Sequence, residues 1–291
     1  MIGQKLIYVR AGGKKENYSD TVVISAERDT DYVIGSPRGL SGVTTKITAV
    51  TAPGQHGEYF QNINLDARYV TDTIHIRGKD REDMYKKRLH LLEVLNPLYG
   101  EGTLYYSNAF GEWCIPAVAK TYGESNERVM KNYNSIKVEF YCQDPYWREI
   151  NPHREVVYAT GEGMLLPVEL PAMLGTYVEH SRFKIPCSSE TPVVITVKGN
   201  TRNICIENIS TGQYMRFETE TSGDDVLTID TGSYGATITR AGVDYDDIIC
   251  PDFGSEYLKL QPGINDIKVG FGYSGEGTEV SIEYSLRFAG V

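Results

Sequence analysis

The sequence lacks the features that mark membrane-spanning, exported and disulfide-rich proteins. No apolar run approaches the about 18 residues of a membrane-spanning helix. The N-terminus alternates Ile2, Leu6 and Ile7 with polar residues instead of forming the apolar core of a signal peptide. Its five cysteines are scattered over 291 residues without a C-x-x-C pair. We therefore expect a soluble chain that is not exported, with reduced, buried thiols.

The motifs of common enzyme classes are also missing. No P-loop, G-x-S-x-G or H-E-x-x-H motif occurs. Gly270, Gly272 and Gly275 have the G-x-G-x-x-G spacing of dinucleotide-binding loops, but residues 278–288 alternate like a strand. Without a helix N-terminus to bind a pyrophosphate, we interpret this motif as a hairpin turn. The sequence predicts no catalytic residue, no cofactor and no metal site.

Positive charge is scarce. The chain has 29 Lys and Arg against 39 Asp and Glu, a net charge of -10. Such a surface repels phosphate backbones and gains little from counterion release, which argues against specific nucleic-acid binding. The 41% hydrophobic content is that of a globular protein, and the 21 Tyr and 29 Gly suit half-buried strands and their turns.

Alternation of apolar and polar residues runs along most of the chain and predicts a mainly β protein. It is clearest at Ile136–Cys142 and Val280–Phe288, where one face is apolar and the other polar. Clusters of Gly, Pro, Asn, Asp and Ser separate the segments, as in antiparallel sandwiches and barrels. Shorter segments with the same pattern are 2–9, 19–25, 43–50, 69–77, 103–107, 193–198, 203–207, 213–219, 226–230, 235–240 and 265–271.

One segment, 80–95, has the period of an amphipathic helix. Asp80 is a plausible N-cap, and Asn96-Pro97 ends the helix. We expect this single helix to pack on a sheet through a central apolar stripe, flanked by Met84, Leu91 and Leu95. The residues of that stripe are Tyr85, Leu89 and Leu92.

A domain boundary is predicted after the strand that ends near Cys142. The prolines that follow make continuous regular structure improbable, so we place an N-terminal domain at 1–147 and a C-terminal domain at 148–291. Pro145 forces an extended exit from the strand, and Tyr146 and Trp147 offer large apolar surfaces that anchor the crossing. These three residues are assigned a structural role.

A second set of structural residues is predicted near the C-terminus. Pro262 and Gly263 suit a type II turn, with glycine at the position of positive φ. Asn265 can hydrogen-bond the local backbone where the next strand starts. We assign these residues a structural role and no catalytic role.

Several landmarks, taken in order, resemble the distal tail (Dit) proteins of long-tailed bacteriophages and related tail-like particles. In the first domain they are Gly54–Tyr59, the strand with Arg68, Ile74 and Ile76, the single helix, Asn96-Pro97, Gly102–Leu104 and Cys142–Trp147. In the second domain they are Leu166–Pro171, Asn208–Gly212, Leu227–Thr231, Leu260–Asn265 and Phe288–Val291.

The resemblance implies a β-barrel or sandwich-like first domain with one helix and a galectin-like antiparallel β-sandwich as the second. It further implies that the first domain forms a homohexameric ring. The ring would join the tail tube protein to the tail hub or fibre protein, and it could carry receptor-binding proteins. Such a protein is a virion component at the distal tip of the tail, is assembled in the host cytoplasm, and contacts no membrane. DNA only passes through the ring.

Two other functions remain open at the level of the sequence. One is binding of a host-surface carbohydrate by exposed aromatic residues such as Tyr214, Tyr234 or Tyr273. The other is a tail-associated glycosidase that uses a carboxylate pair such as Glu101 and Glu112.

Overall fold

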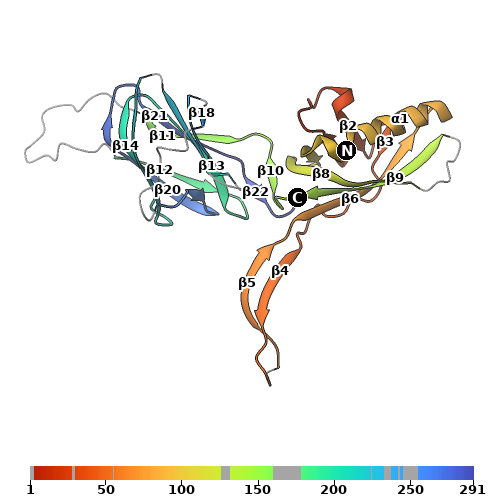
Figure 1. The fold of residues 1–291 in the computed structure, drawn as a ribbon, viewed down its shortest axis with the longest axis horizontal. Coiled ribbons are helices and arrows are strands. Elements are labelled where there is room, and N and C mark those ends of the chain that lie inside the picture. The colour runs from red at the N-terminus through yellow and green to blue at the C-terminus, as the bar shows by residue number, and fades with distance from the viewer. Residues whose placement is uncertain are drawn as a thin grey trace, which may run out of the picture. The chain divides into compact units, whose positions relative to one another are not determined.

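The computed structural model describes residues 3–27, 30–54, 56–125, 132–159, 178–223, 225–232, 237–241, 243–244 and 255–291. Contacts divide the chain into two compact units: unit 1, Met1–Ile150 with Phe288–Val291, and unit 2, Asn151–Arg287. Both are mainly β, as predicted, and the described residues contain one α-helix (Figure 1). No helix in these ranges is long and apolar enough to cross a membrane.

Unit 1 is built around a closed barrel of seven strands. The strand order is β8-β7-β1-β2-β3-β6-β9, and β9 pairs back with β8 to close the barrel. Alternate side chains of these strands point into one core because successive residues of a strand face opposite sides. The strands are β1 (Lys5–Val9), β2 (Thr21–Ser25), β3 (Tyr32–Val33), β6 (Arg68–Arg77), β7 (Gly102–Ser107), β8 (Glu112–Ser125) and β9 (Tyr133–Cys142). Two 3-10 turns, η1 (Tyr18–Asp20) and η2 (Pro97–Tyr99), join them.

The longest barrel strand, β8, was not predicted from the sequence. This strand pairs with β7 over Glu112–Ala117 and with β9 over Val118–Ser125. Its residues 113–119 are apolar on both faces and include a proline, so the strand has no period-2 alternation to detect.

The chain returns to unit 1 at its end. Two short strands, β10 (Trp147–Glu149) and β22 (Arg287–Phe288), extend the barrel sheet beyond β8. Phe288 and Val291 pack against the barrel core. The sequence places residues 148–150 and 288–291 in the second domain, whereas in the structure both stretches lie with unit 1 because of this pairing and packing.

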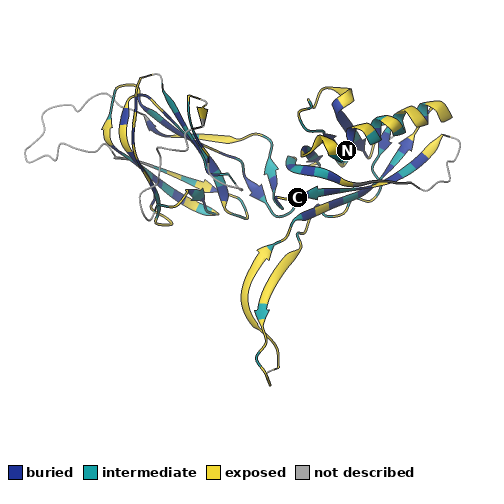
Figure 2. Cartoon of the chain, viewed as in Figure 1, coloured by how far each residue is buried: buried dark blue, intermediate teal, exposed yellow. Residues whose placement is uncertain are grey.

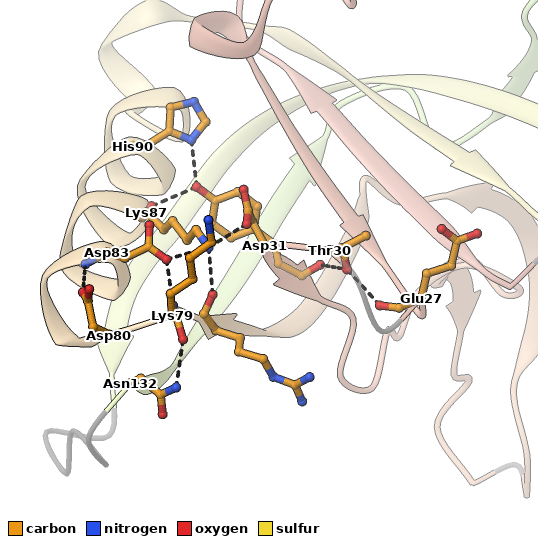
Figure 3. A network of polar contacts seen from close by, with 12 residues as sticks. Glu27, Thr30, Asp31, Lys79, Asp80, Asp83, Lys87, His90 and Asn132 are labelled. Atoms are coloured by element: carbon orange, nitrogen blue, oxygen red, sulfur yellow. Dashed lines mark hydrogen bonds and ion pairs between the residues drawn. The ribbon is translucent and has the colours of Figure 1, made fainter.

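The helix α1 (Arg81–Val94) is fixed to the barrel by the network in Figure 3. Asp80 caps it as predicted, accepting a hydrogen bond from the Asp83 amide at 2.8 Å. The ammonium of Lys87 lies 2.7 Å from Asp31, which precedes β3, and 3.0 Å from Asp83. Hydrogen bonds from the Lys79 amide and from Lys87 hold the pKa of the Asp83 carboxyl below its ordinary value. The network therefore ties the first turns of the helix to β3.

The prediction of which helix face packs on the barrel is wrong. The buried face is rotated about the helix axis relative to the predicted one. Met84, Leu91, Val94 and Leu95 are buried, whereas Leu89 is 67% exposed. His90 fills the interface on one side: its ring stacks on Tyr18 and hydrogen-bonds the Tyr32 hydroxyl at 2.8 Å. Contacts with residues distant in sequence thus select which of two adjacent apolar stripes faces the barrel.

Unit 2 consists of two antiparallel sheets, the β-sandwich expected from the sequence. The first sheet has the order β11-β21-β13-β16-β17-β18, with β19 also paired to β13, and the second has the order β12-β20-β14-β15. The first-sheet strands are β11 (His153–Ala159), β13 (Thr191–Lys198), β16 (Val226–Asp230), β17 (Thr237–Arg240), β18 (Val243–Asp244), β19 (Lys259–Leu260) and β21 (Glu279–Tyr284). The second-sheet strands are β12 (Val178–Ile185), β14 (Thr201–Asn208), β15 (Gln213–Thr221) and β20 (Gly263–Ser274).

The G-x-G-x-x-G motif is followed by a strand, as predicted, but it does not form a hairpin. Gly270 and Gly272 lie inside β20, and Gly275 begins the connection to β21. Strand β20 pairs with β12 and β14, whereas β21 pairs with β11 and β13. The connection therefore crosses from one sheet of the sandwich to the other. Alternation in two successive strands cannot tell a hairpin from such an arch.

Candidate functional site

The most exposed regular structure of unit 1 is a two-stranded ribbon of β4 (Thr45–Val50) and β5 (Tyr59–Leu65). Figure 2 shows it in yellow, extending away from the barrel strands. An isolated two-stranded hairpin is at best marginally stable in water, so a free ribbon of this kind indicates a missing partner. Three of its large apolar side chains are at least half exposed: Ile47 at 60%, Phe60 at 64% and Ile63 at 50%.

A β-bulge collects these apolar side chains on one face of the ribbon. Ile47 lies opposite Ile63 and Ala49 lies opposite Phe60, while Gln61 between them has no opposite residue. Residues that lie opposite each other share a face, and so do residues two apart on a regular strand. On a regular strand Phe60 and Ile63, which are three residues apart, would lie on opposite faces; the bulge at Gln61 places them on the same one.

The other face of the ribbon is mostly polar. Burying a large apolar side chain contributes about 1.5 to 3 kcal/mol, so covering the three on the apolar face would stabilise a complex by several kcal/mol. The ribbon is therefore a candidate interaction site for another protein chain. The side chains on the polar face are Lys46, Thr48, Asn62 and Asn64, with Val50 and Tyr59 nearest the turn.

The predicted crossing residues lie at the base of unit 1. Trp147 is completely buried, and its indole donates a hydrogen bond to the Leu40 carbonyl at 3.2 Å. The Pro145 carbonyl accepts a hydrogen bond from Arg68 Nε at 2.8 Å. Tyr146 is only half-buried, so Trp147 supplies most of the apolar anchoring surface. Their assignment as structural residues stays a prediction.

Arg68 connects the chain segments that meet around these crossing residues. Its buried guanidinium donates hydrogen bonds to the carbonyls of Gly39, Leu40, Gly42, Pro145 and Ala289, which belong to three separate chain segments. No carboxylate within the described residues forms an ion pair with it. Burial lowers the pKa of Arg68 from its ordinary value.

In the sequence, Arg68 stood out only as part of the family resemblance, and this role was not predicted. A signal was present, because Arg68 has the same parity in its strand as the buried residues Val70, Ile74 and Ile76. A charged residue on the apolar face of an alternating strand must find partners inside the protein.

In unit 2 one of the predicted turn residues, Asn265, belongs to a buried polar cluster. Gly263 has a positive φ of 101°. Asn265 is fully buried, and its Nδ2 donates to the Gln261 carbonyl at 2.8 Å. Its Oδ1 accepts from the Gln261 amide at 3.0 Å and from Asn208 Nδ2 at 2.9 Å. Asn265 therefore ties the turn before β20 to the end of β14; its structural assignment, with that of Pro262 and Gly263, also stays a prediction.

We expect Asn265→Ala to lower the free energy of unfolding of unit 2 by about 2 to 3 kcal/mol, because it leaves buried donors and acceptors without partners. Differential scanning calorimetry of the full chain measures this effect. Asn200→Ala, which alters an exposed asparagine, is the matched control and should change stability by less than about 0.5 kcal/mol. Equal effects of the two variants would show that the buried hydrogen bonds of Asn265 contribute no more to the free energy of unfolding than an exposed asparagine does.

The residues considered for sugar chemistry are not brought together. Tyr214 and Tyr273 lie opposite Glu207 and Arg202, five residues apart on β14, or roughly 17 Å. Tyr234 lies outside the described residues.

Glu101 and Glu112 lie at opposite ends of the β7–β8 pair, roughly 20 Å apart along the strands. A glycosidase needs its two carboxylates about 5 to 9.5 Å apart. This pair cannot act as one.

The described cysteines and acidic residues form no evident reactive centre. Cys114, Cys142, Cys187 and Cys205 are free thiols, and Cys250 lies outside the described residues. Burial raises the pKa of the Cys142 thiol to about 12, which keeps it protonated at neutral pH. In the described part of the chain, no group of three or more His, Cys, Asp or Glu side chains is placed to hold a metal ion.

Comparison with known proteins gives two family matches that follow each other along the chain. Residues 24–142 match a phage tail protein RIFT-related domain, and residues 187–288 match the C-terminal domain of a siphovirus-type tail component. No curated protein matches the sequence.

Solved structures show the same fold. The SPP1 Dit (gp 19.1) protein, described as a hub of the adsorption apparatus in phages that infect Gram-positive bacteria, has a TM-score of 0.67 at 12% identity, covering 98% of this chain and 99% of that one. A chain of the phage P2 baseplate, in its activated conformation with calcium, has a TM-score of 0.54 at 13% identity and covers 100% of both chains.

Proposed function

Because the chain belongs to the distal tail (Dit) protein family of siphophages and acts as a distal tail adaptor, we propose that it does so as a homohexameric ring. The ring joins the tail tube protein to the hub or fibre protein and can carry receptor-binding proteins. The chain is a component of the phage tail, and its assembly takes place in the host cytoplasm.

The observation that carries the ring is the amphipathic β4–β5 ribbon. Its apolar face, centred on Ile47, Phe60 and Ile63, is uncovered in a single chain. If the ribbon of one copy covers a different surface of the next copy, the contact is head-to-tail, and such contacts close into rings when the rotation allows. A second copy of this chain is the partner present wherever the protein is made.

This assignment gives the two units different roles. Unit 1, which carries the ribbon, forms the ring, as proposed for residues 1–147. The sandwich of unit 2, proposed as the galectin-like domain of residues 148–291, offers sheet faces for further tail proteins. DNA passes through the ring without specific contacts, because the net charge of -10 opposes binding of phosphates. A ring lumen lined with Lys and Arg would contradict this last point.

We propose further that the protein catalyses no reaction and needs no cofactor. The roughly 20 Å separation of Glu101 and Glu112 supports this, because it removes the carboxylate pair considered from the sequence. Incubation with host wall polysaccharide should release no reducing sugar. Release that disappears when one acidic residue is replaced would overturn the proposal.

The ring itself is tested by light scattering after size exclusion. We expect a mass of about 195 kDa, six times the 32.5 kDa of one chain. Electron microscopy of native tails labelled through this chain should place it at the distal tip. A chain that stays monomeric at every concentration and is absent from the tail tip would refute the adaptor assignment.

A further inference from the structure

The segment that leads into the ribbon, residues 34–44, runs tightly along strand β6. Arg38 and Thr71 exchange two backbone hydrogen bonds, at 2.8 and 3.1 Å. Beyond this bridge, the Thr44 carbonyl accepts a hydrogen bond from the Asp66 amide at 2.8 Å, which closes the base of the ribbon. We call residues 34–44 the root segment. Its path fixes where the ribbon leaves the barrel.

Two glycines allow this close approach. A Cβ atom at Gly35 would lie 2.3 Å from the Thr73 carbonyl oxygen, and one at Gly39 would lie 2.0 Å from the Tyr69 carbonyl oxygen. Gly39 also has a φ of +83°, a conformation that other residues rarely adopt. The root segment is therefore pressed against the backbone of β6 at both positions.

Two buried charged residues of β6 hold the root segment from the inward face of the strand. Arg68 donates to the carbonyls of Gly39, Leu40 and Gly42, at the end of the root nearer the ribbon. Asp72, four residues along, is 2% exposed and has the same parity. The positive side chain thus meets carbonyls, and the negative one lies beside the start of the root.

Asp72 lies beside the backbone amides of Gly35 and Ser36. Burial raises the pKa of its carboxyl, while the amides of Thr73, Ser36 and Gly35 lower it. Neither carboxylate oxygen has a hydrogen bond of regular geometry within the described residues. A buried charge held this way is costly, so its cost must be offset elsewhere in the structure. Because Asp72 lies beside Gly35 and Ser36, it can order the backbone of these two residues.

We propose that Arg68 and Asp72 are positioning residues for the β4–β5 ribbon: together they clamp the root segment to β6 and so set the direction in which the ribbon leaves the barrel. This inference rests on the proposed role of the ribbon in ring formation. A strand of six residues is about 20 Å long, so a change of about 10° at its base moves its far end by about 3.5 Å. Such a displacement is enough to break a packed interface.

Asp72 tests the clamp, because Arg68 also donates to the carbonyls of Pro145 and Ala289, outside the root, whereas Asp72 forms no hydrogen bond with either within the described residues. Asp72→Val removes the carboxylate that lies beside the Gly35 and Ser36 amides, whereas Asp72→Asn keeps a polar side chain of the same shape without the charge. Hydrogen exchange of the full chain, kept dilute enough to be monomeric, reports on the root amides. We expect amides at 35–42 to exchange at least tenfold faster in Asp72→Val and little faster in Asp72→Asn, with the amides of β9 unchanged in both.

Arg68→Lys gives a second test if Asp72→Val fails to fold. Lysine keeps the charge but has fewer donors, so the amides at 35–42 should again exchange faster than in the wild type. Unchanged exchange at 35–42 in variants that fold would overturn the proposal.

Ring formation separates the clamp from the proposed function. Faster exchange at the root together with loss of the 195 kDa species supports the clamp. Faster exchange with an intact ring would overturn it, because the ribbon would then not need a fixed root. Failure of the proposed function is seen separately, as a wild-type chain that forms no ring at all.

Discussion

Replacing Arg68 by methionine should lower the free energy of unfolding of unit 1 by about 3 to 5 kcal/mol, because it removes the donors from five carbonyls in a buried site. Methionine fills a similar volume, so the loss measures the hydrogen bonds more than the packing. The three segments that Arg68 joins would lose their common partner at once. We therefore expect the root segment, the Pro145 turn and the C-terminal residues to loosen together.

Tryptophan fluorescence in urea measures this change in unit 1 alone. The chain has two tryptophans, and both Trp113 and Trp147 lie in unit 1. Arg182→Met is the matched control, because the Arg182 side chain is 70% exposed in unit 2 and pairs only at the surface. It should leave the fluorescence transition unchanged. A shift of less than about 1 kcal/mol in Arg68→Met would mean that water replaces the guanidinium at little cost.

Replacing Phe60 by glutamate should abolish the ring. Phe60 is 64% exposed in the single chain, so the substitution costs the monomer little. In the ring the same position would bury an unpaired carboxylate, which costs several kcal/mol at every one of the six interfaces. We expect the mass measured by light scattering to fall from about 195 kDa to 32.5 kDa.

Asn64→Glu provides the control for this experiment. Asn64 lies on the same strand and is also exposed, but it points to the mostly polar face of the ribbon. Both variants add one negative charge to the same hairpin, so a general charge effect would act on both. The interface assignment predicts a ring for Asn64→Glu only. Loss of the ring in both variants, or in neither, would show that the apolar face is not the contact surface.

The local elements of this fold follow closely from the sequence. The helix begins after Asp80 and ends before Asn96-Pro97, since capping and proline act within a few residues. Strands β6 and β9 match the alternating segments 69–77 and 136–142 over most of their length, whereas the segment 280–288 is divided between β21 and β22, which belong to different sheets. Alternation is strongest where one face of a strand is wet, which is why β8, apolar on both faces, was missed.

The sequence predicted only one of the two strands of the ribbon. Residues 43–50 were predicted as a strand, but β5 was not, because Gln61 breaks its alternation. The bulge at this residue places Phe60 on the same face as Ile63. The bulge that creates the candidate interface also interrupts the period-2 alternation, so the strand that contains it was not predicted.

The sequence by itself determined that the chain is a mainly β protein with one capped helix, since alternation, capping and turn residues act between neighbours along the chain. It also carried the ordered landmarks that identify the family. Only the tertiary structure decided that Arg68 gathers carbonyls from three segments, that the last residues return to unit 1, and that β20 and β21 belong to different sheets. Each of these depends on contacts between residues far apart in sequence, and the pattern of one strand contains no information about which distant backbone will lie beside it.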